Sequence, residues 1–158
     1  MSYLRMNQYI TRSLILIILV GAISCSPKVL TPGLVKHVKS DGREIIEVNS
    51  DEYGKTSYQA TMNAEKLAIK QLIYYGLAGS PLADPMTKES DMESDKNKKY
   101  FENLFANNGY RKFITCSNVL KSEEISKSKY HNTVHCCIAY RNLRMDLEKN
   151  GVIKKLGF

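Results

Sequence analysis

Three cysteines and two histidines in the second half of the chain are the residues best suited to do chemistry: Cys116, Cys136, Cys137, His131 and His135. On a β-strand, His135 and Cys137 would share one face about 6.5–7 Å apart, close enough to grip one Zn²⁺. His131 would lie about 13 Å from His135 and would not easily join them. Two ligands do not make a metal site. We therefore expect ordinary sheet-face residues here and no metal.

Catalysis is not expected either. A cysteine nucleophile needs a paired base and an orienting group, and Cys137 beside His135 supplies only part of that set. The chain has no Gly-x-Ser-x-Gly elbow, no phosphate-binding glycine loop, no His-Glu-x-x-His and no Cys-x-x-Cys. We therefore expect neither an enzyme nor a cofactor, and no small-molecule substrate.

These cysteines can form a disulfide if the chain reaches an oxidising compartment. Adjacent cysteines rarely bridge each other because the geometry is strained. Cys116 would therefore pair with Cys136 or with Cys137. The alternative is a free buried thiol, and the sequence leaves these possibilities open.

The fourth cysteine, Cys25, ends a segment with the order of a secretory signal peptide. Two arginines flank a polar opening, and no acidic residue precedes Cys25. An uninterrupted apolar block, residues 14–20, closes on a run of mostly small residues, 21–24. The apolar stretch is about half of the roughly 20 residues that a spanning helix needs. We expect a signal peptide over residues 1–24.

With cysteine at that position, the segment resembles a bacterial lipoprotein precursor with the lipobox Ala22-Ile23-Ser24-Cys25. The family usually has Leu where this chain has Ala22. The resemblance implies that the Cys25 thiol takes a diacylglycerol, that the preceding peptide bond is cut, and that the new amino terminus is acylated, for example with palmitate. Two or more acyl chains anchor a protein stably. The alternatives are an uncleaved signal anchor and a secretory signal with a coincidental cysteine.

The residues after the lipobox bear on location. Residues 25–33 contain two prolines and predict a lipidated, extended tether, whose eight residues after Cys25 reach at most about 28 Å. Ser26 stands where Asp would favour inner-membrane retention, and no Lys followed by two acidic residues is found after Cys25. The resemblance therefore implies an outer-membrane lipoprotein, held by its lipid anchor on the periplasmic face.

Charge and length limit the other partners. Removing the two arginines before Cys25 from the 23 basic residues leaves 21 against 16 acidic residues, a net charge of +5. The positive charge is spread along the chain, without an Arg-rich helix or a basic aromatic platform, so no nucleic-acid partner is expected. Residues 34–158 are long enough for a single domain with a modest core.

Two β-hairpins are predicted. Asp41-Gly42 lies between β-rich runs and favours a type I′ turn. The last strand alternates, and its two faces are predicted to carry Val134, Cys136, Ile138 and Tyr140 on one side and His131, Thr133, His135 and Cys137 on the other. The predicted strands span residues 34–39, 44–48, 111–120 and 130–141, with a polar connection at 121–129.

Three helices are predicted. Thr56-x-x-Gln59 has the spacing of a capping box, and apolar side chains then recur at helical spacing as far as Tyr75, before Gly76. An alanine stripe on this helix is expected to pack against the sheet, and the alternative is a pairing face in an oligomer. The other two predicted helices span residues 98–108 and 142–150.

Residues 77–95 form a long break with two prolines and five acidic residues. Such a length indicates either a mobile loop or a partner-docking segment, to which Met86 and Met92 would add apolar contacts. The acidic residues lack the spacing of a calcium-binding loop. We expect a solvated loop or a docking segment, and the sequence does not separate the two.

The order β-β-α-α-β-β-α predicts an α+β, two-layer sandwich in which helices cover one face of an antiparallel sheet of two hairpins. Its size and layout are similar to the small accessory lipoprotein of type VI secretion membrane complexes in Bacteroidetes-type bacteria. This resemblance implies a structural or accessory subunit of a cell-envelope assembly, with envelope proteins as partners. The alternative function is a periplasmic module that binds peptidoglycan or another ligand.

Overall fold

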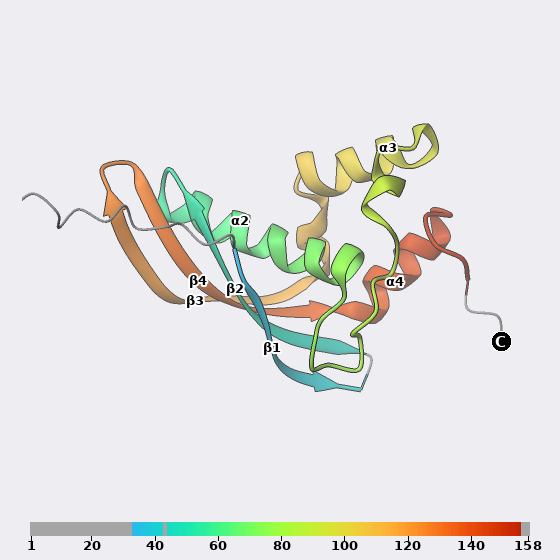
Figure 1. Ribbon diagram of the computed structural model, residues 1–158, viewed down its shortest axis with the longest axis horizontal. Coiled ribbons are helices and arrows are strands. Elements are labelled where there is room, and N and C mark those ends of the chain that lie inside the picture. Colours follow the sequence, from blue (N-terminus) through green and yellow to red (C-terminus); the bar gives the residue numbers. More distant parts are fainter. Residues whose placement is uncertain (1–32, 43, 156–158) are drawn as a thin grey trace, which may run out of the picture. The chain divides into compact units, whose positions relative to one another are not determined.

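A four-stranded antiparallel sheet organises the part of the chain that the structure describes, residues 33–42 and 44–155 of a computed structural model (Figure 1). Across the sheet the order is β1-β2-β4-β3, because the last strand, β4, pairs with β2 in the centre. The α+β class is confirmed, and the order across the sheet differs from the order along the chain. The strands are β1 (Val35–Asp41), β2 (Ile45–Gly54), β3 (Ile114–Ser126) and β4 (Lys129–Ala139).

Several predictions concern residues outside the described ranges. These are the signal peptide at 1–24, Cys25 with its lipidation, and all of the tether except Gly33. The side chain of Met92 is also not described. Within the described ranges, no helix is both long and apolar enough to cross a membrane.

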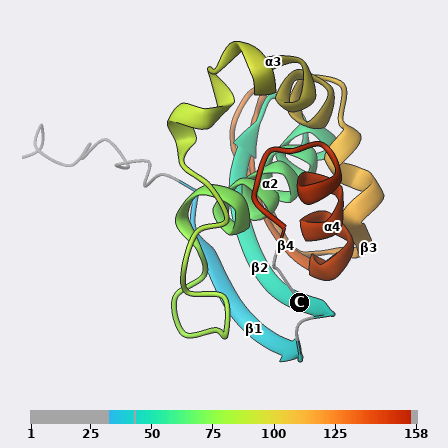
Figure 2. The same ribbon diagram turned by 90° about the vertical axis from the view of Figure 1, so that its right-hand side faces the viewer.

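The helices α2 (Ser57–Lys70), α3 (Asp95–Phe101) and α4 (Tyr140–Lys149) share one core with one face of the sheet (Figure 2). Strand residues alternate between this inner face and the outer face, as the pleat requires. The outer face carries partly exposed polar side chains, among them Glu47, Asn49 and His135. Side chains in the shared core include Ile46, Val48, Val134, Ile138, Ala64, Phe101, Leu143 and Leu147.

Local signals define α2 well. The Thr56 hydroxyl accepts a hydrogen bond from the Gln59 N–H at 3.1 Å, and the Gln59 side chain accepts one from the Lys55 N–H at 3.0 Å. The helix continues through a π-helical turn to Tyr75 and ends at Gly76, which has a φ of 70°. Its alanine stripe is fully buried inside the domain, which favours core packing over an oligomer face; the stripe is Ala60, Ala64 and Ala68.

The first hairpin forms, but the predicted type I′ turn over Asp41-Gly42 is wrong. Asp41 still pairs with Ile45 as the last residue of β1, and its carbonyl accepts from the Glu44 N–H at 3.1 Å. Among the described residues of this turn, only Gly42 has a positive φ, 55°. β1 therefore extends two residues beyond the predicted end at residue 39, and the turn begins at Gly42. The second strand, predicted at 44–48, begins one residue later and continues to Gly54, because it pairs with β4 over its whole length.

The polar connection predicted at 121–129 is also wrong, because β3 continues to Ser126. Its polar residues keep pairing with β4 as far as Ser126 opposite Lys129. A tight turn follows, in which Ser128 has a φ of 64°. The polar composition reflects the exposure of these side chains, while β4 pairs with the backbone groups on one side of the strand.

Two helix boundaries shift as well. The helix predicted at 98–108 begins at Asp95 and continues from α3 into a π-helical turn that ends at Ala106. The strand predicted to reach Arg141 ends at Ala139, and Tyr140 becomes the first residue of α4. Tyr140 remains buried, so the apolar pattern there continues through the change from strand to helix.

A buried amide joins the second hairpin to α2. The side-chain nitrogen of Asn132, on β4, lies 2.8 Å from the Ser57 carbonyl and 2.9 Å from the Thr61 hydroxyl. Its side-chain oxygen accepts from the Ser122 hydroxyl of β3 at 2.7 Å. Asn132 is completely buried, so these bonds replace the hydration that it loses on folding.

We predict that Asn132→Ala lowers the free energy of unfolding by about 2–4 kcal/mol, since it removes three hydrogen bonds of about 1 kcal/mol each and leaves their partners unsatisfied. Urea denaturation of a soluble form beginning at Leu34 measures this, and we expect a single cooperative transition. The matched control is Asn118→Ala, because Asn118 is an exposed asparagine of β3. Equal losses from both substitutions, or two transitions in the parent, would contradict the prediction.

Candidate functional site

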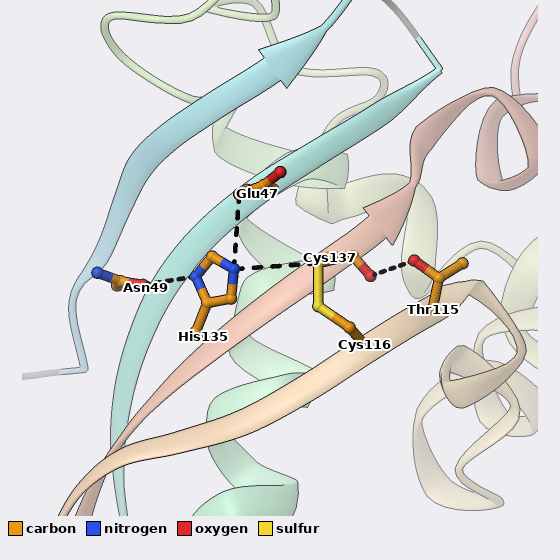
Figure 3. The surroundings of a disulfide bond; sticks show 6 residues. All are labelled: Glu47, Asn49, Thr115, Cys116, His135 and Cys137. Atoms are coloured by element: carbon orange, nitrogen blue, oxygen red, sulfur yellow. Dashed lines mark hydrogen bonds and ion pairs between the residues drawn. A yellow bond between two sulfur atoms is a disulfide. The ribbon is translucent and has the colours of Figure 1, made fainter.

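The three cysteines of the described chain separate to the two faces of the sheet. Cys116 of β3 and Cys137 of β4 are register partners and form a disulfide on the outer face, with a Cα–Cα distance of 4.8 Å (Figure 3). Cys136, one residue earlier on β4, points into the core as a free, fully buried thiol. Alternation along β4 thus decides which of the two adjacent cysteines can reach Cys116.

His135 lies beside this disulfide and is held by β2 (Figure 3). Its Nε2 is 3.9 Å from the Cys137 sulfur and 3.6 Å from a Glu47 carboxylate oxygen. Its Nδ1 is 3.0 Å from the side-chain oxygen of Asn49. The side chains of His135 and Glu47 are 22% and 32% exposed, so the cluster is open to solvent.

His131 occupies a separate position on the same face. Its ring stacks on Tyr53 with the ring centres 4.5 Å apart, and its Nε2 is 3.6 Å from an Asp51 carboxylate oxygen. The prediction that His131 does not join His135 and Cys137 agrees with this placement.

Sequence reasoning missed Cys116, Glu47 and Asn49 as neighbours of His135. Glu47 and Asn49 alternate on β2, which is the pattern of one strand face, but the sequence does not give the register of β2 against β4. The structure places Glu47 opposite Cys137 and Asn49 opposite His135. The face of Cys116 depends in addition on an irregularity in β3 between Ile114 and Cys116.

A second candidate site is a groove of about 590 Å³ between α4 and the segment Pro81–Met86. Its apolar lining includes Pro85, Met86 and Met145, the last of which is 49% exposed. Its charged groups are largely paired with one another. Arg141 Nη1 lies 2.6 Å from a Glu44 carboxylate oxygen, and Arg144 pairs with Glu148 at 3.0 Å.

The first part of the long break, which forms one wall of this groove, is fixed to the domain. The Met86 and Thr87 N–H groups both donate to the Ile73 carbonyl, at 2.9 and 3.0 Å. Leu82 is buried, and its carbonyl accepts from the Leu77 N–H at 2.7 Å. An entirely solvated loop over residues 77–95 is therefore not what the structure shows. The wall is a preformed surface, which reduces the entropy lost when a partner binds.

Comparisons with protein family models, with curated proteins and with solved structures find no match to this chain.

The buried thiol of Cys136 has a strongly shifted pKa. Burial, and to a lesser degree the charge of Glu65, raises the pKa of Cys136 to about 12. A raised pKa favours the protonated thiol in the folded state. Its contribution to stability is therefore present below about pH 9 and is lost as the pH rises toward 12.

We predict that native, unreduced protein beginning at Leu34 is not alkylated at pH 8, because Cys136 is buried and protonated while Cys116 and Cys137 are bonded. Denaturant without reductant should expose one reactive thiol per chain, and reduction should add two. Mass spectrometry after alkylation measures each count. Cys136→Ala is the matched control and should lose only the thiol exposed by denaturant. Labelling of the native, unreduced protein would contradict the prediction.

Proposed function

We propose that this chain is an outer-membrane lipoprotein, anchored through Cys25 on the periplasmic face, that acts as a structural or accessory subunit of a cell-envelope assembly. The anchor rests on the signal-peptide order of residues 1–24 and on the lipobox Ala22–Cys25. The type VI secretion membrane complex is the particular assembly we propose, on the similarity of size and layout to its small accessory lipoprotein.

The disulfide supports the compartment. Cys116 and Cys137 are bonded and partly exposed. Disulfides persist in the bacterial periplasm and are rare in the cytosol, where thiols are kept reduced. The periplasm is one of the oxidising compartments in which such a bond persists, which supports the proposed location.

The groove beside α4 is the observation that carries the accessory role. It combines an exposed apolar strip with charged groups that already have partners, and one of its walls is fixed by backbone hydrogen bonds. A surface of this kind suits binding of a protein segment. The methionines that line the groove can adapt to the segment's side chains, and few charged groups of the groove need new partners. The occupant we propose is an apolar segment of a neighbouring envelope protein.

A periplasmic ligand-binding module is the second candidate. It is favoured by the groove volume of about 590 Å³, which lies within the range of small-ligand pockets. Sedimentation of the chain with purified peptidoglycan, unaffected by changes that abolish protein complexes, would support this candidate.

We predict that Cys25→Ser abolishes lipidation and moves the chain from the membrane fraction to the soluble fraction, because the acyl chains supply the anchor. Metabolic labelling with a fatty-acid analogue, followed by fractionation, measures both effects. Cys136→Ser is the matched control, since it also removes a thiol and should leave labelling unchanged. Label retained after Cys25→Ser would contradict lipidation at this residue.

We predict that Met145→Glu lowers recovery of the envelope complex from detergent extracts by about tenfold, which corresponds to about 1.4 kcal/mol. A carboxylate there would be desolvated in the complex, whereas Met145 is half exposed in the free domain. The control is Tyr58→Glu, because Tyr58 is 67% exposed and lies in the first turn of α2, whereas the groove wall is bonded to Ile73, beyond the last turn of that helix. Equal recovery for Met145→Glu and the parent would show that the groove is not the docking site.

A further inference from the structure

Four side chains with metal-binding atoms converge on the outer face of the sheet (Figure 3). One ligand atom from each of Cys116, His135 and Cys137 lies within 4.8 Å of the other two. Glu47 adds a carboxylate oxygen 3.6 Å from His135 Nε2. A tetrahedral zinc ion with bonds of about 2.0–2.3 Å holds its ligand atoms about 3.3–3.8 Å apart. The structure therefore brings four candidate ligands together, whereas the sequence indicated only His135 and Cys137.

The orientation of His135 suits a metal ligand. The side-chain oxygen of Asn49 can only accept, so its distance of 3.0 Å from Nδ1 places the ring proton on Nδ1. In the neutral imidazole, which is the form that binds a metal, Nε2 then carries the free electron pair, and it faces the Cys137 sulfur and the Glu47 carboxylate. Metal-binding histidines usually donate their other ring N–H in this way, which fixes the ring and its tautomer.

We propose that, when the Cys116–Cys137 disulfide is reduced, the chain binds one Zn²⁺ through both cysteine sulfurs and His135 Nε2, with the Glu47 carboxylate as the fourth ligand. Two thiolates, one imidazole and one carboxylate are ligands that zinc accepts in a closed tetrahedral site. They come from three neighbouring strands, so the ion would join β2, β4 and β3 across the outer face.

The change between the two forms balances with a dithiol reductant. One thiolate of the reductant attacks a disulfide sulfur, and its second thiol resolves the mixed disulfide. The transfer of two electrons converts Cys116 and Cys137 to thiols and converts the reductant to a disulfide. Zinc then displaces one proton from each thiol to solvent, because the thiolate is the ligand. Oxidation and zinc binding compete for the same two sulfurs.

The test uses the full chain in detergent with Cys25→Ser, so that an unlipidated Cys25 thiol cannot bind the ion. The probe is Zn²⁺ alone, added after reduction by a phosphine, which competes less for the ion than a dithiol does. We expect one zinc per reduced chain and none per oxidised chain by dialysis and elemental analysis. Co²⁺ in place of zinc should give the absorption bands of a tetrahedral thiolate complex.

Substitutions test the two thiolates and the imidazole as ligands. Cys116→Ser, Cys137→Ser and His135→Asn should each abolish stoichiometric binding. Asn49→Ala should weaken binding about 10- to 100-fold, through loss of the acceptor that orients the ring. The matched control is His131→Asn, because His131 lies on the same face of the same strand beside carboxylates but without a thiol.

Several results would overturn the proposal. The first is a reduced chain that binds no zinc. The second is an oxidised chain that binds as much zinc as the reduced chain. The third is a His131→Asn variant that loses as much zinc binding as His135→Asn does. Circular dichroism of the same samples covers the case in which reduction unfolds the chain. The proposal then requires that zinc restores the fold, and failure to do so also overturns it.

Discussion

The pairing of β2 with β4 is the constraint on which the rest of the structure depends. It joins two hairpins that are far apart in the sequence, and it runs from Ile45 opposite Ala139 to Gly54 opposite Tyr130. On the inner face this register builds the floor on which α2 packs. On the outer face it brings Glu47 and Asn49 to His135 and Cys137. A slip of one residue would exchange the two faces of a strand, and would lose the core and the cluster together.

The elements that the sequence predicts correctly are those defined by local patterns. A cap at Thr56, buried alanines at helical spacing and a glycine stop are enough to place α2 and its end. The alternation on β4 separates Cys136 from Cys137 without tertiary information. These features depend on residues within a few positions of one another, so a short stretch of sequence is enough to predict them.

The errors arise where tertiary pairing overrides local composition. Residues 121–126 are polar enough to indicate a loop, yet pairing with β4 keeps them in a strand. Asp41 pairs with Ile45, which moves the first turn. The neighbours of His135 depend on the register between two hairpins and on an irregularity before Cys116. None of these quantities has a signature in a single strand.

The irregular pairing of β3 has a further consequence. As an edge strand of 13 residues, it has backbone groups on one side that no strand of the described sheet pairs with. Long, flat edges invite strand addition by other chains and hence aggregation. Along β3, however, the register with β4 shifts at three places, and Lys121 and Glu123 are among its outward side chains. Bulges and charges of this kind protect an edge, because an incoming strand cannot match its spacing or bury its charges. Irregularity in β3 thus hinders the addition of a further strand at this edge of the sheet.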